Sequence, residues 1–238
     1  MTHEKKTGIT VFANISGFSA VESLREGFYR TLTLQYLRVI SAWFIVSLTL
    51  HLLNPLIAQI GSLFIMSAVS VAWYRSLAFQ EEAPFLRFSK SELVYLFYTI
   101  FIGMTVLFLG LITSIITARL GMIGLSFGGL FLTGLFFWCM PFIFVFLGLV
   151  AMGFDGSSVL KDVKNIVLPI HFQLLIIYLS LIVLNTCVVV GLVFLIKDFG
   201  PTFLLEGVIM MLQFLFAGIL NTFTSHIIYT RCSYEKPY

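Results

Sequence analysis

The chain has 238 residues, of which 59% are hydrophobic and only 11% are charged, with a mean hydropathy of +1.03. Soluble domains are about half apolar and about a quarter charged, so this composition excludes a sizeable soluble domain. The net charge of +3 comes from basic residues that are spread over several loops, and no single basic face could follow a nucleic-acid backbone. The length fits one domain rather than two.

Six stretches are long and apolar enough to cross a bilayer, which takes about 20 mainly apolar residues. Their approximate bounds are Tyr36 to Leu53, Pro55 to Tyr74, Leu93 to Ala118, Phe127 to Met152, Pro169 to Ile196 and Phe203 to Ile228. We expect Pro141 to kink the fourth helix, because proline removes a backbone donor. The sequence therefore predicts an all-α, polytopic transmembrane bundle of six helices, with a cytoplasmic tail at 1–18 and a single membrane domain at 19–238.

An N-terminal amphipathic helix is predicted before the first span, from Ser19 to Leu34. Ser19 and Glu22 have the spacing of a capping box. The apolar side chains that follow recur at helical spacing, and charged side chains fill the other face. We expect this helix to lie along the membrane interface, with Leu24 in the headgroup boundary and Arg25 in water.

A second two-faced segment, Ser158 to Leu168, precedes the fifth span. Its apolar and polar side chains separate onto opposite faces of a helix. We expect it to lie in the same interface, with Val163 in the headgroup boundary and Lys164 in water.

Lys and Arg residues are distributed unevenly between the loops. If the N-terminus is inside, every basic residue of the 14 except Arg119 and Lys197 lies in an inside segment. Cytoplasmic loops of membrane proteins carry such an excess of basic residues. We therefore expect a multi-pass protein of the plasma membrane with its N-terminus and C-terminus in the cytoplasm.

The densest polar stretch lies between the second and third spans and contains Trp73, Tyr74, Arg75, Glu82 and Arg87. Trp and Tyr favour the membrane–water interface. Arginine recognises phosphate through a planar fork of donors. The stretch is therefore the candidate lipid- or partner-binding site. An ordinary aromatic belt, with Arg75 or Arg87 paired to Glu82, is the alternative interpretation.

Glu206 is an intramembrane carboxylate candidate near the outer end of the last span. Acidic residues inside a membrane are functional candidates by default. Glu206 also falls near the first turn of its helix, where the helix dipole favours negative charge, and Lys197 is close in sequence. A structural cap or ion pair therefore competes with a functional role.

Motifs for catalysis, metal binding and cofactor binding are missing from the sequence, so we expect no enzyme, no metal site and no cofactor. No two histidines have ligand spacing. Cys139, Cys187 and Cys232 form neither a disulfide framework nor a zinc spacing, and we expect them to be buried apolar side chains. Three amides lie deep in the spans and are expected to hold helices together: Asn185, Gln213 and Asn221.

The run Trp73-Tyr74-Arg75, with an amphipathic helix before it and Glu82 and Arg87 after it, resembles a group of bacterial inner-membrane proteins of unknown function. These are similar in layout to the membrane domain that is fused to some glycerophosphodiester phosphodiesterases. The resemblance covers mainly residues 19 to 95. It implies a fold, six spans in a bacterial inner membrane, and it says little about activity. Tyr74 departs from the histidine of that group, and the chain lacks a phosphodiesterase domain.

These observations favour a non-enzymatic inner-membrane protein that organises lipids or partner proteins at the cytoplasmic face. The expected partners are membrane lipids and other membrane proteins, and nucleic acid is not expected. The alternative is a small permease or channel subunit, in which a polar, water-accessible path would cross the bundle. Because central charges are scarce in the spans, the first hypothesis is favoured.

Overall fold

The computed structural model describes residues 9–11, 19–81, 88–118, 121–196 and 202–234. The helices in chain order are α1 (Ala20–Thr31), α2 (Leu34–Leu53), α3 (Pro55–Phe79), α4 (Lys90–Ala118), α5 (Gly121–Ala151), α6 (Gly156–Val167), α7 (His171–Ile196) and α8 (Thr202–Arg231). A 3-10 turn, Leu168–Ile170, joins α6 to α7, and two short strands are β1 (Ile9–Val11) and β2 (Cys232–Tyr234). Six helices of the described chain are long and apolar enough to cross a membrane, which confirms the six predicted spans.

The turn between α2 and α3 shows how the sequence sets these boundaries. Asn54 has extended backbone angles and ends α2, and Pro55 occupies the first position of α3. Proline suits that position because its missing N–H would have no partner there. The side chain of Asn54 accepts a hydrogen bond from the backbone N–H of Ile57 at 3.3 Å. The two helices therefore reverse direction over a single residue.

The two ends of the described chain lie together. β1 pairs with β2 in an antiparallel ladder in which Ile9 faces Tyr234 and Val11 faces Cys232. The first and last described residues therefore lie on the same side of the molecule, as an even number of spans requires.

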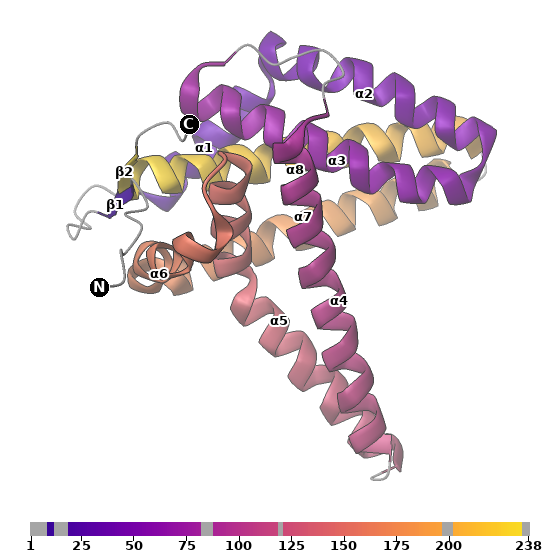
Figure 1. Ribbon diagram of the computed structural model, residues 1–238. Helices are drawn as coiled ribbons and strands as arrows, with labels where there is room; N and C mark the ends of the chain where they lie inside the picture. The colour runs from indigo at the N-terminus through magenta and orange to yellow at the C-terminus, as the bar shows by residue number, and fades with distance from the viewer. Residues whose placement is uncertain (1–8, 12–18, 82–87, 119–120, 197–201, 235–238) are drawn as a thin grey trace.

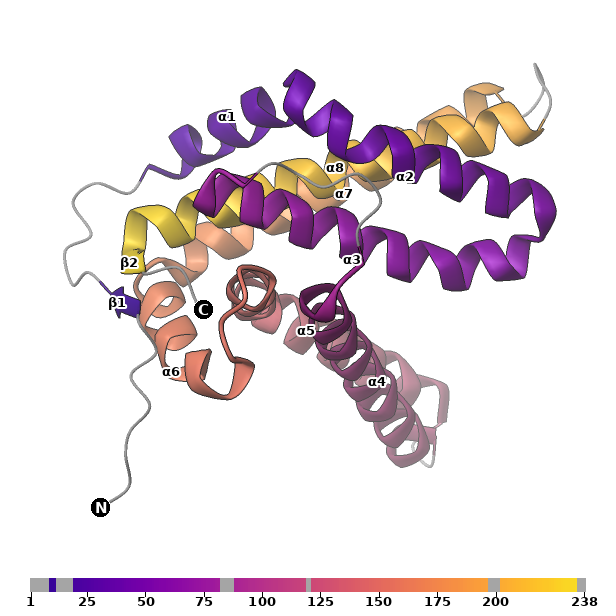
Figure 2. The same ribbon diagram turned by 45° about the horizontal axis from the view of Figure 1, so that its top comes forward.

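Helices α1, α2, α3 and α8 lie along one another, whereas the α4–α5 hairpin projects away from them (Figures 1 and 2). One buried cluster joins α2, α3 and α8 through residues such as Tyr36, Trp73 and Phe214. A second joins the inner part of α5 to α6, α7 and α8 through residues such as Val159 and Phe223. The prediction of a bundle is therefore right for the part of the molecule that these two clusters hold.

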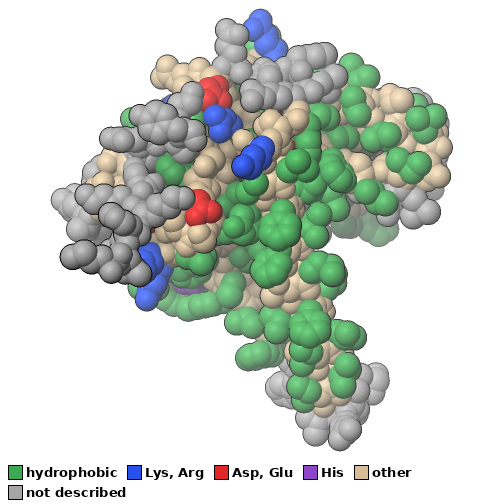
Figure 3. Space-filling view, viewed as in Figure 1, with side chains coloured by type: hydrophobic (Ala, Val, Ile, Leu, Met, Phe, Trp, Pro, Cys, Tyr) green, Lys and Arg blue, Asp and Glu red, His purple; other side chains and the backbone are tan. Residues whose placement is uncertain are grey.

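The α4–α5 hairpin is not part of that packed core. None of the apolar window within Lys90–Thr117 is buried, whereas 56% of the window within Ile60–Phe79 on α3 is buried. Apolar side chains cover the projecting hairpin (Figure 3), among them Leu107, Phe108 and Phe131, each more than half exposed. The six long helices are thus present as predicted, but the α4–α5 hairpin presents its apolar surface outward and does not join the packed bundle.

Burial along α5 changes at the predicted position of the kink. Leu135 and Trp138 are exposed, whereas Met140, Pro141 and the turns after them are mostly buried. The helix itself continues through Pro141. Pro141 therefore marks the boundary between the projecting part and the packed part of α5.

Helix α1 forms where it was predicted, and the Ser19 hydroxyl oxygen accepts from the Glu22 N–H at 3.3 Å. Its position in the membrane interface remains a prediction. The face that packs on the protein contains small residues, since Ser23, Gly27 and Thr31 are buried while Val21 is 79% exposed. Leu24 is half-buried against the protein core rather than free to enter a headgroup layer.

Helix α6 also forms where it was predicted, but its apolar face is covered by protein. Val159 and Val163 are buried in the cluster that α5 and α8 share, so the expected insertion of Val163 into the headgroup boundary is wrong. Lys164 is exposed, in agreement with the prediction. The amphipathic pattern was correct, but α6 uses it to pack against the protein.

Candidate functional site

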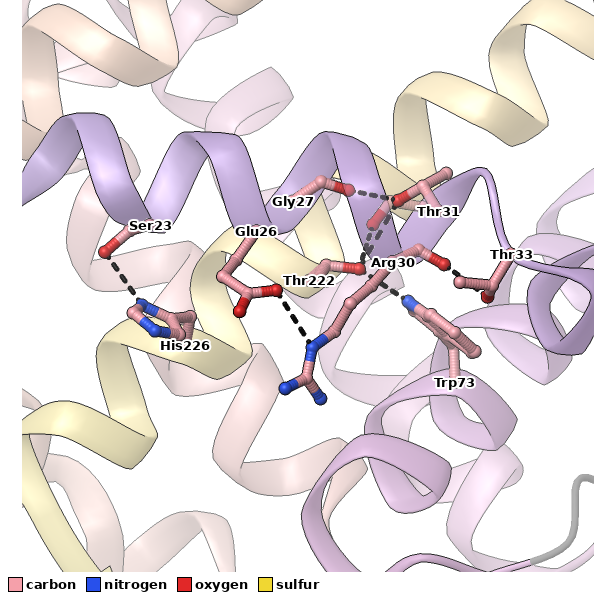
Figure 4. Close-up of polar contacts among 10 residues, drawn as sticks. Ser23, Glu26, Gly27, Arg30, Thr31, Thr33, Trp73, Thr222 and His226 are labelled. Atoms are coloured by element: carbon pink, nitrogen blue, oxygen red, sulfur yellow. Dashed lines mark hydrogen bonds and ion pairs between the residues drawn. The ribbon is translucent and has the colours of Figure 1, made fainter.

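A seam of buried polar side chains joins α1, α3 and α8. The indole N–H of Trp73 donates to the Thr222 hydroxyl oxygen at 2.7 Å, and that oxygen lies 3.4 Å from the Thr31 hydroxyl (Figure 4). The Asn221 amide donates to the Ser70 hydroxyl at 3.0 Å, as expected for an amide that holds helices together. The polar atoms of the seam satisfy one another, so they fix the positions of the three helices.

Small residues let α1 approach α8 closely. A Cβ on Gly27 would lie 3.2 Å from the Ile219 carbonyl oxygen, which leaves little room for any other residue there. Ser23, one turn earlier, contacts His226 (Figure 4). This approach brings the charged side chains of α1 beside the last turns of α8.

A cavity of about 210 Å³ opens between α1, the end of α3 and α8, and we call it the polar cleft. Its lining residues are Glu26, Arg30, Leu77, Gln80, Thr222, Ser225, His226 and Tyr229. Both charged residues come from α1, and most of the hydrogen-bonding groups come from α8. The cleft lies beside the C-terminal ends of α3 and α8.

The two charged groups of the cleft are one helical turn apart. The Arg30 Nε–H donates to Glu26 Oε2 at 3.2 Å, and the side chains are 52% and 39% exposed. An exposed pair of this kind contributes little to stability, because water and salt screen it. A ligand can therefore replace this contact with contacts of its own at small cost.

His226 of α8 lines the cleft, and its Nε2 has no hydrogen-bond partner among the residues that the structure describes. Its Nδ1 lies 2.9 Å from the Ser23 hydroxyl oxygen, and the Ser23 hydroxyl donates to the Ser19 carbonyl at 3.0 Å. Since the single proton of that hydroxyl is already used, His226 Nδ1 is the donor of the pair. The neutral ring then carries its lone pair on Nε2, which can accept a hydrogen bond.

Trp73 and Tyr74, two of the candidate lipid- or partner-binding residues, lie inside the protein and not on its surface, which also argues against the alternative of an exposed aromatic belt. Each side chain is only 1% exposed. The Trp73 ring packs edge-on against Tyr36 at a centroid distance of 4.8 Å. Tyr74 packs on the other side of α3, close to Gly148 of α5. Aromatic residues with a polar atom can serve as core residues when that atom finds a partner inside, as the Trp73 indole does.

Arg75 has a carboxylate partner, Glu81, where the alternative interpretation of this stretch paired Arg75 or Arg87 with Glu82. The guanidinium Nε and Nη2 donate to the two carboxylate oxygens at 2.8 and 2.9 Å. Gln80 adopts a positive φ of 53°, which ends α3 and turns the chain so that Glu81 returns toward Arg75. Glu82 and Arg87, the other two candidates, lie outside the described residues. Arg75 is thus a helix-end ion pair rather than part of the polar cleft.

Glu206 also has a partner, on a different helix. Its Oε2 lies 2.7 Å from His51 Nε2, at the opposite end of the molecule from the polar cleft. The contact joins the end of α2 to the beginning of α8, which favours a structural interpretation of this carboxylate. Lys197, the partner suggested by sequence, lies outside the described residues.

The three cysteines differ in their surroundings. Cys232 is buried, Cys139 is half-buried and Cys187 is exposed on α7, so the expectation of burial is wrong for Cys187. Burial, with a smaller effect of the nearby Asp162 carboxylate, raises the pKa of the Cys232 thiol to about 12, and Arg231 acts in the opposite direction. Cys232 is therefore a neutral, unreactive thiol at neutral pH.

The residues of the polar cleft carried weak signals in the sequence. Glu26 and Arg30 have the i,i+4 spacing of a helical ion pair, which is common on any exposed helix. His226 stands alone near the end of the last span, about two hundred residues away. Only the packing of α1 on α8 brings them together.

Comparisons with known proteins assign no family. No protein-family model matches the chain, and neither a curated protein nor a solved structure matches it. A function has to be argued from the geometry of the chain itself.

Proposed function

We propose that this chain is a non-enzymatic integral membrane protein that binds a zwitterionic phospholipid headgroup in the polar cleft. The observation that carries the proposal is the pair of opposite charges, Glu26 and Arg30, at the end of apolar membrane-crossing helices. A headgroup such as phosphoethanolamine joins an ammonium to a phosphate. The carboxylate suits the ammonium, and the guanidinium suits the phosphate.

The surroundings of the cleft fit an amphipathic ligand. Tyr229 lines the cleft and is 70% exposed, as is typical of an aromatic side chain at a membrane–water interface. On α1 and at the residue that follows it, the exposed apolar side chains include Val21, Phe28 and Leu32. Apolar surface next to a charged cleft is what a bound lipid needs, because its chains stay in the bilayer while its headgroup is held.

The size of the cleft supports a headgroup rather than a larger ligand. Sites for drug-sized molecules occupy roughly 300–1,000 Å³. The polar cleft, at about 210 Å³, is smaller than this range. A headgroup can enter it while the acyl chains remain outside.

The buried polar residues favour this function over a permease. Thr222, Asn221 and Ser70 are each less than 10% exposed and bond to neighbouring helices. Side chains that satisfy one another in this way hold a bundle together. They serve packing rather than lining a path for a solute.

The proposal includes an orientation with the cleft, the N-terminus and the C-terminus in the cytoplasm of a bacterial cell. It is supported by the Lys/Arg distribution and by the pairing of β1 with β2. A reporter that is active only in the cytoplasm should be active when it is fused after Tyr238. A reporter that is active only outside should be active when it is placed in the turn at Asn54. A fusion after Tyr238 that is active only outside would contradict this orientation.

Lipid retention tests the function directly. The protein is purified from membranes that contain phosphatidylethanolamine and phosphatidylcholine, and the bound lipid is counted by mass spectrometry. We expect phosphatidylethanolamine to be enriched, because its ammonium can donate hydrogen bonds to Glu26 and a quaternary choline cannot. Glu26→Gln should reduce the enrichment severalfold, and Arg30→Gln should reduce the amount of both lipids severalfold, because the two lipids share the phosphate.

Arg25→Gln is the matched control. Arg25 lies on the same helix and is exposed, but it does not line the cleft and lies 5.4 Å over the Tyr29 ring instead. This variant should retain phosphatidylethanolamine like the unmodified protein. If all three variants retain the same lipids in the same amounts, the polar cleft is not a headgroup site.

A further inference from the structure

A second hollow runs along the seam between α4 and α5, far from the polar cleft. It consists of two adjoining cavities of about 250 and 410 Å³. Both are lined by Phe101, Ile102 and Ile143, so they form one continuous groove, which we call the hairpin groove. The hairpin groove shares no lining residue with the polar cleft.

The walls of the hairpin groove are apolar over most of its length. On α4 they extend from Tyr98 to Leu109, and on α5 from Leu132 to Phe146. The α4 stretch covers about 16 Å at 1.5 Å per residue. The groove is therefore long, narrow and apolar, and it lies on the hairpin whose surface is exposed.

Polar groups gather at one end of the hairpin groove. There, the first turn of α6 contributes Ser157, and Lys164 lies two turns further along the same wall. The Ser157 hydroxyl is bonded to the carboxylate of Asp155, the residue before α6. Lys164 is exposed and is the charged residue among those that line the groove.

We infer that the hairpin groove binds one acyl chain of an anionic phospholipid, with the lipid phosphate beside Lys164. The chain would lie along the seam of α4 and α5, and the ammonium of Lys164 would neutralise the phosphate at the end of α6. This inference does not rest on the proposed headgroup site in the polar cleft, because the two sites share no lining residue.

The dimensions favour an acyl chain over a helix of another protein. An α-helix with its side chains is about 10 Å across, so a helical segment as long as the groove would occupy more than about 1,000 Å³. This is more than the volumes of the two cavities, about 250 and 410 Å³, taken together. An acyl chain is a few ångströms across and bends freely. Gly156 also matters here, because a Cβ at this position would lie 2.5 Å from the Tyr98 hydroxyl oxygen and would crowd the polar end of the groove.

Photo-crosslinking in vesicles tests the inference. The protein is reconstituted in phosphatidylcholine vesicles that contain phosphatidylglycerol with a diazirine in its acyl chain. We expect crosslinks, mapped by peptide mass spectrometry, to concentrate on the residues of the hairpin groove. Ile143→Trp fills the groove and should remove most of these crosslinks, whereas Ile115→Trp, on an exposed face of α4 outside the groove, should leave them.

Two lysine variants test the headgroup contact without changing the apolar walls. Lys164→Gln should lower crosslinking of phosphatidylglycerol relative to a phosphatidylcholine probe by about fivefold, the factor that corresponds to ~1 kcal/mol for one basic residue near anionic lipid. Lys161→Gln, on the same helix but outside the groove, should change this ratio little.

Two results would overturn the inference. Crosslinks spread evenly over the exposed hairpin would show ordinary annular lipid. Equal effects of Lys164→Gln and Lys161→Gln would show a general surface charge rather than a site. Because Glu26 and Arg30 are unchanged in all these variants, either result would leave the headgroup site in the polar cleft untouched.

Discussion

Helices α3 and α8 and the two helices of the α4–α5 hairpin are all apolar enough to cross a membrane, but they pack in different ways. The candidate span of α4 has a mean hydropathy of 2.3 and none of its apolar window is buried. The candidate span of α3 has a lower mean hydropathy, 1.3, and 56% of its window is buried. The less apolar helix is therefore the more buried one.

Threonine side chains show the reason. Thr222 and Thr224 of α8 bond to the carbonyl four residues earlier and also to Trp73 and Tyr178 of other helices. In the hairpin, hydroxyls such as that of Thr105 bond to the backbone of their own helix. Hydrogen bonds connect the helices of the packed part, whereas threonines of the described hairpin donate within their own helices.

The difference between the two regions reflects which residues hold helices together in a bilayer. Lipid tails are as apolar as leucine, so burying leucine between helices gains little there. Small residues that allow close approach, and polar residues that bond between helices, decide which helices pack. The α3–α8 pair has both, and the outer hairpin has mainly the small residues, such as Gly128 beside Thr117.

The largest predicted effect comes from adding one methyl group at a close approach. A Cβ on Gly218 would overlap the Tyr36 ring, whereas nothing lies within 4 Å of a Cβ on Gly103 in α4. Gly218→Ala should lower the free energy of unfolding in detergent by about 2–3 kcal/mol through overpacking. Gly103→Ala should leave it unchanged or raise it by up to about 1 kcal/mol, because alanine favours helix. Equal losses in the two variants would show that the two regions pack equally tightly.

The next effect comes from removing one hydroxyl of the buried seam. Thr222→Val leaves the Trp73 indole N–H buried without an acceptor, which should cost about 1–1.5 kcal/mol of unfolding free energy. Thr105→Val is the matched change in the hairpin and should cost less than about 0.5 kcal/mol. Reversible unfolding in mixed micelles measures both. A larger loss of unfolding free energy in Thr105→Val than in Thr222→Val would contradict the proposed difference between the two regions.

A smaller effect is expected at the end of α3. The Arg75–Glu81 pair is bidentate, but both side chains are about a quarter exposed, which weakens the attraction. In a double-mutant cycle with Arg75→Ala and Glu81→Gln, we expect a coupling of about 0.5–1 kcal/mol, and the double variant should lose less than the sum of the single ones. Strict additivity would show that this ion pair does not stabilise the helix end.

The smallest effect concerns chemical labelling and leaves the fold unchanged. With the pKa of Cys232 raised to about 12, only about one thiol in ten thousand is ionised at pH 8. N-ethylmaleimide should therefore leave Cys232 unmodified in the folded protein at pH 8 and modify it after unfolding. The half-buried Cys139 of the hairpin groove should react faster in detergent. Rapid labelling of Cys232 at pH 8 would contradict the burial of the β1–β2 end.

The same thiol makes stability depend on pH at the alkaline end. The unfolded thiol ionises near its ordinary pKa of 9, and the folded thiol ionises near 12. Its contribution is thus fully present below pH 9 and is lost between pH 9 and 12. Cys232→Ala should reduce the fall in stability over that range, and an unchanged pH profile would count against the raised pKa.

The sequence by itself determined the number and positions of the helices. Runs of about 20 apolar residues can satisfy their backbone groups in a membrane only as helices, and local signals such as Asn54 before Pro55 set the boundaries. The partners of Arg75 and Glu206 were harder to predict. Some partner for each charge was predictable, because an unpaired charge that is removed from water is costly. The identity of the partner depended on the turn at Gln80 for Arg75, which pairs with Glu81, and on the approach of α2 to α8 for Glu206, which pairs with His51.

Only the tertiary structure decided which faces of these helices pack. Most of the long helices are apolar all round, so no stripe in the sequence tells a lipid-facing side from a protein-facing one. Trp73 and Tyr74 suited a membrane interface by residue type, and the structure buries both because Thr222 and Gly148 on other helices give them a partner and space. Likewise, the polar cleft exists because α1 packs through its small residues, so that Glu26 and Arg30 meet His226 from the other end of the chain.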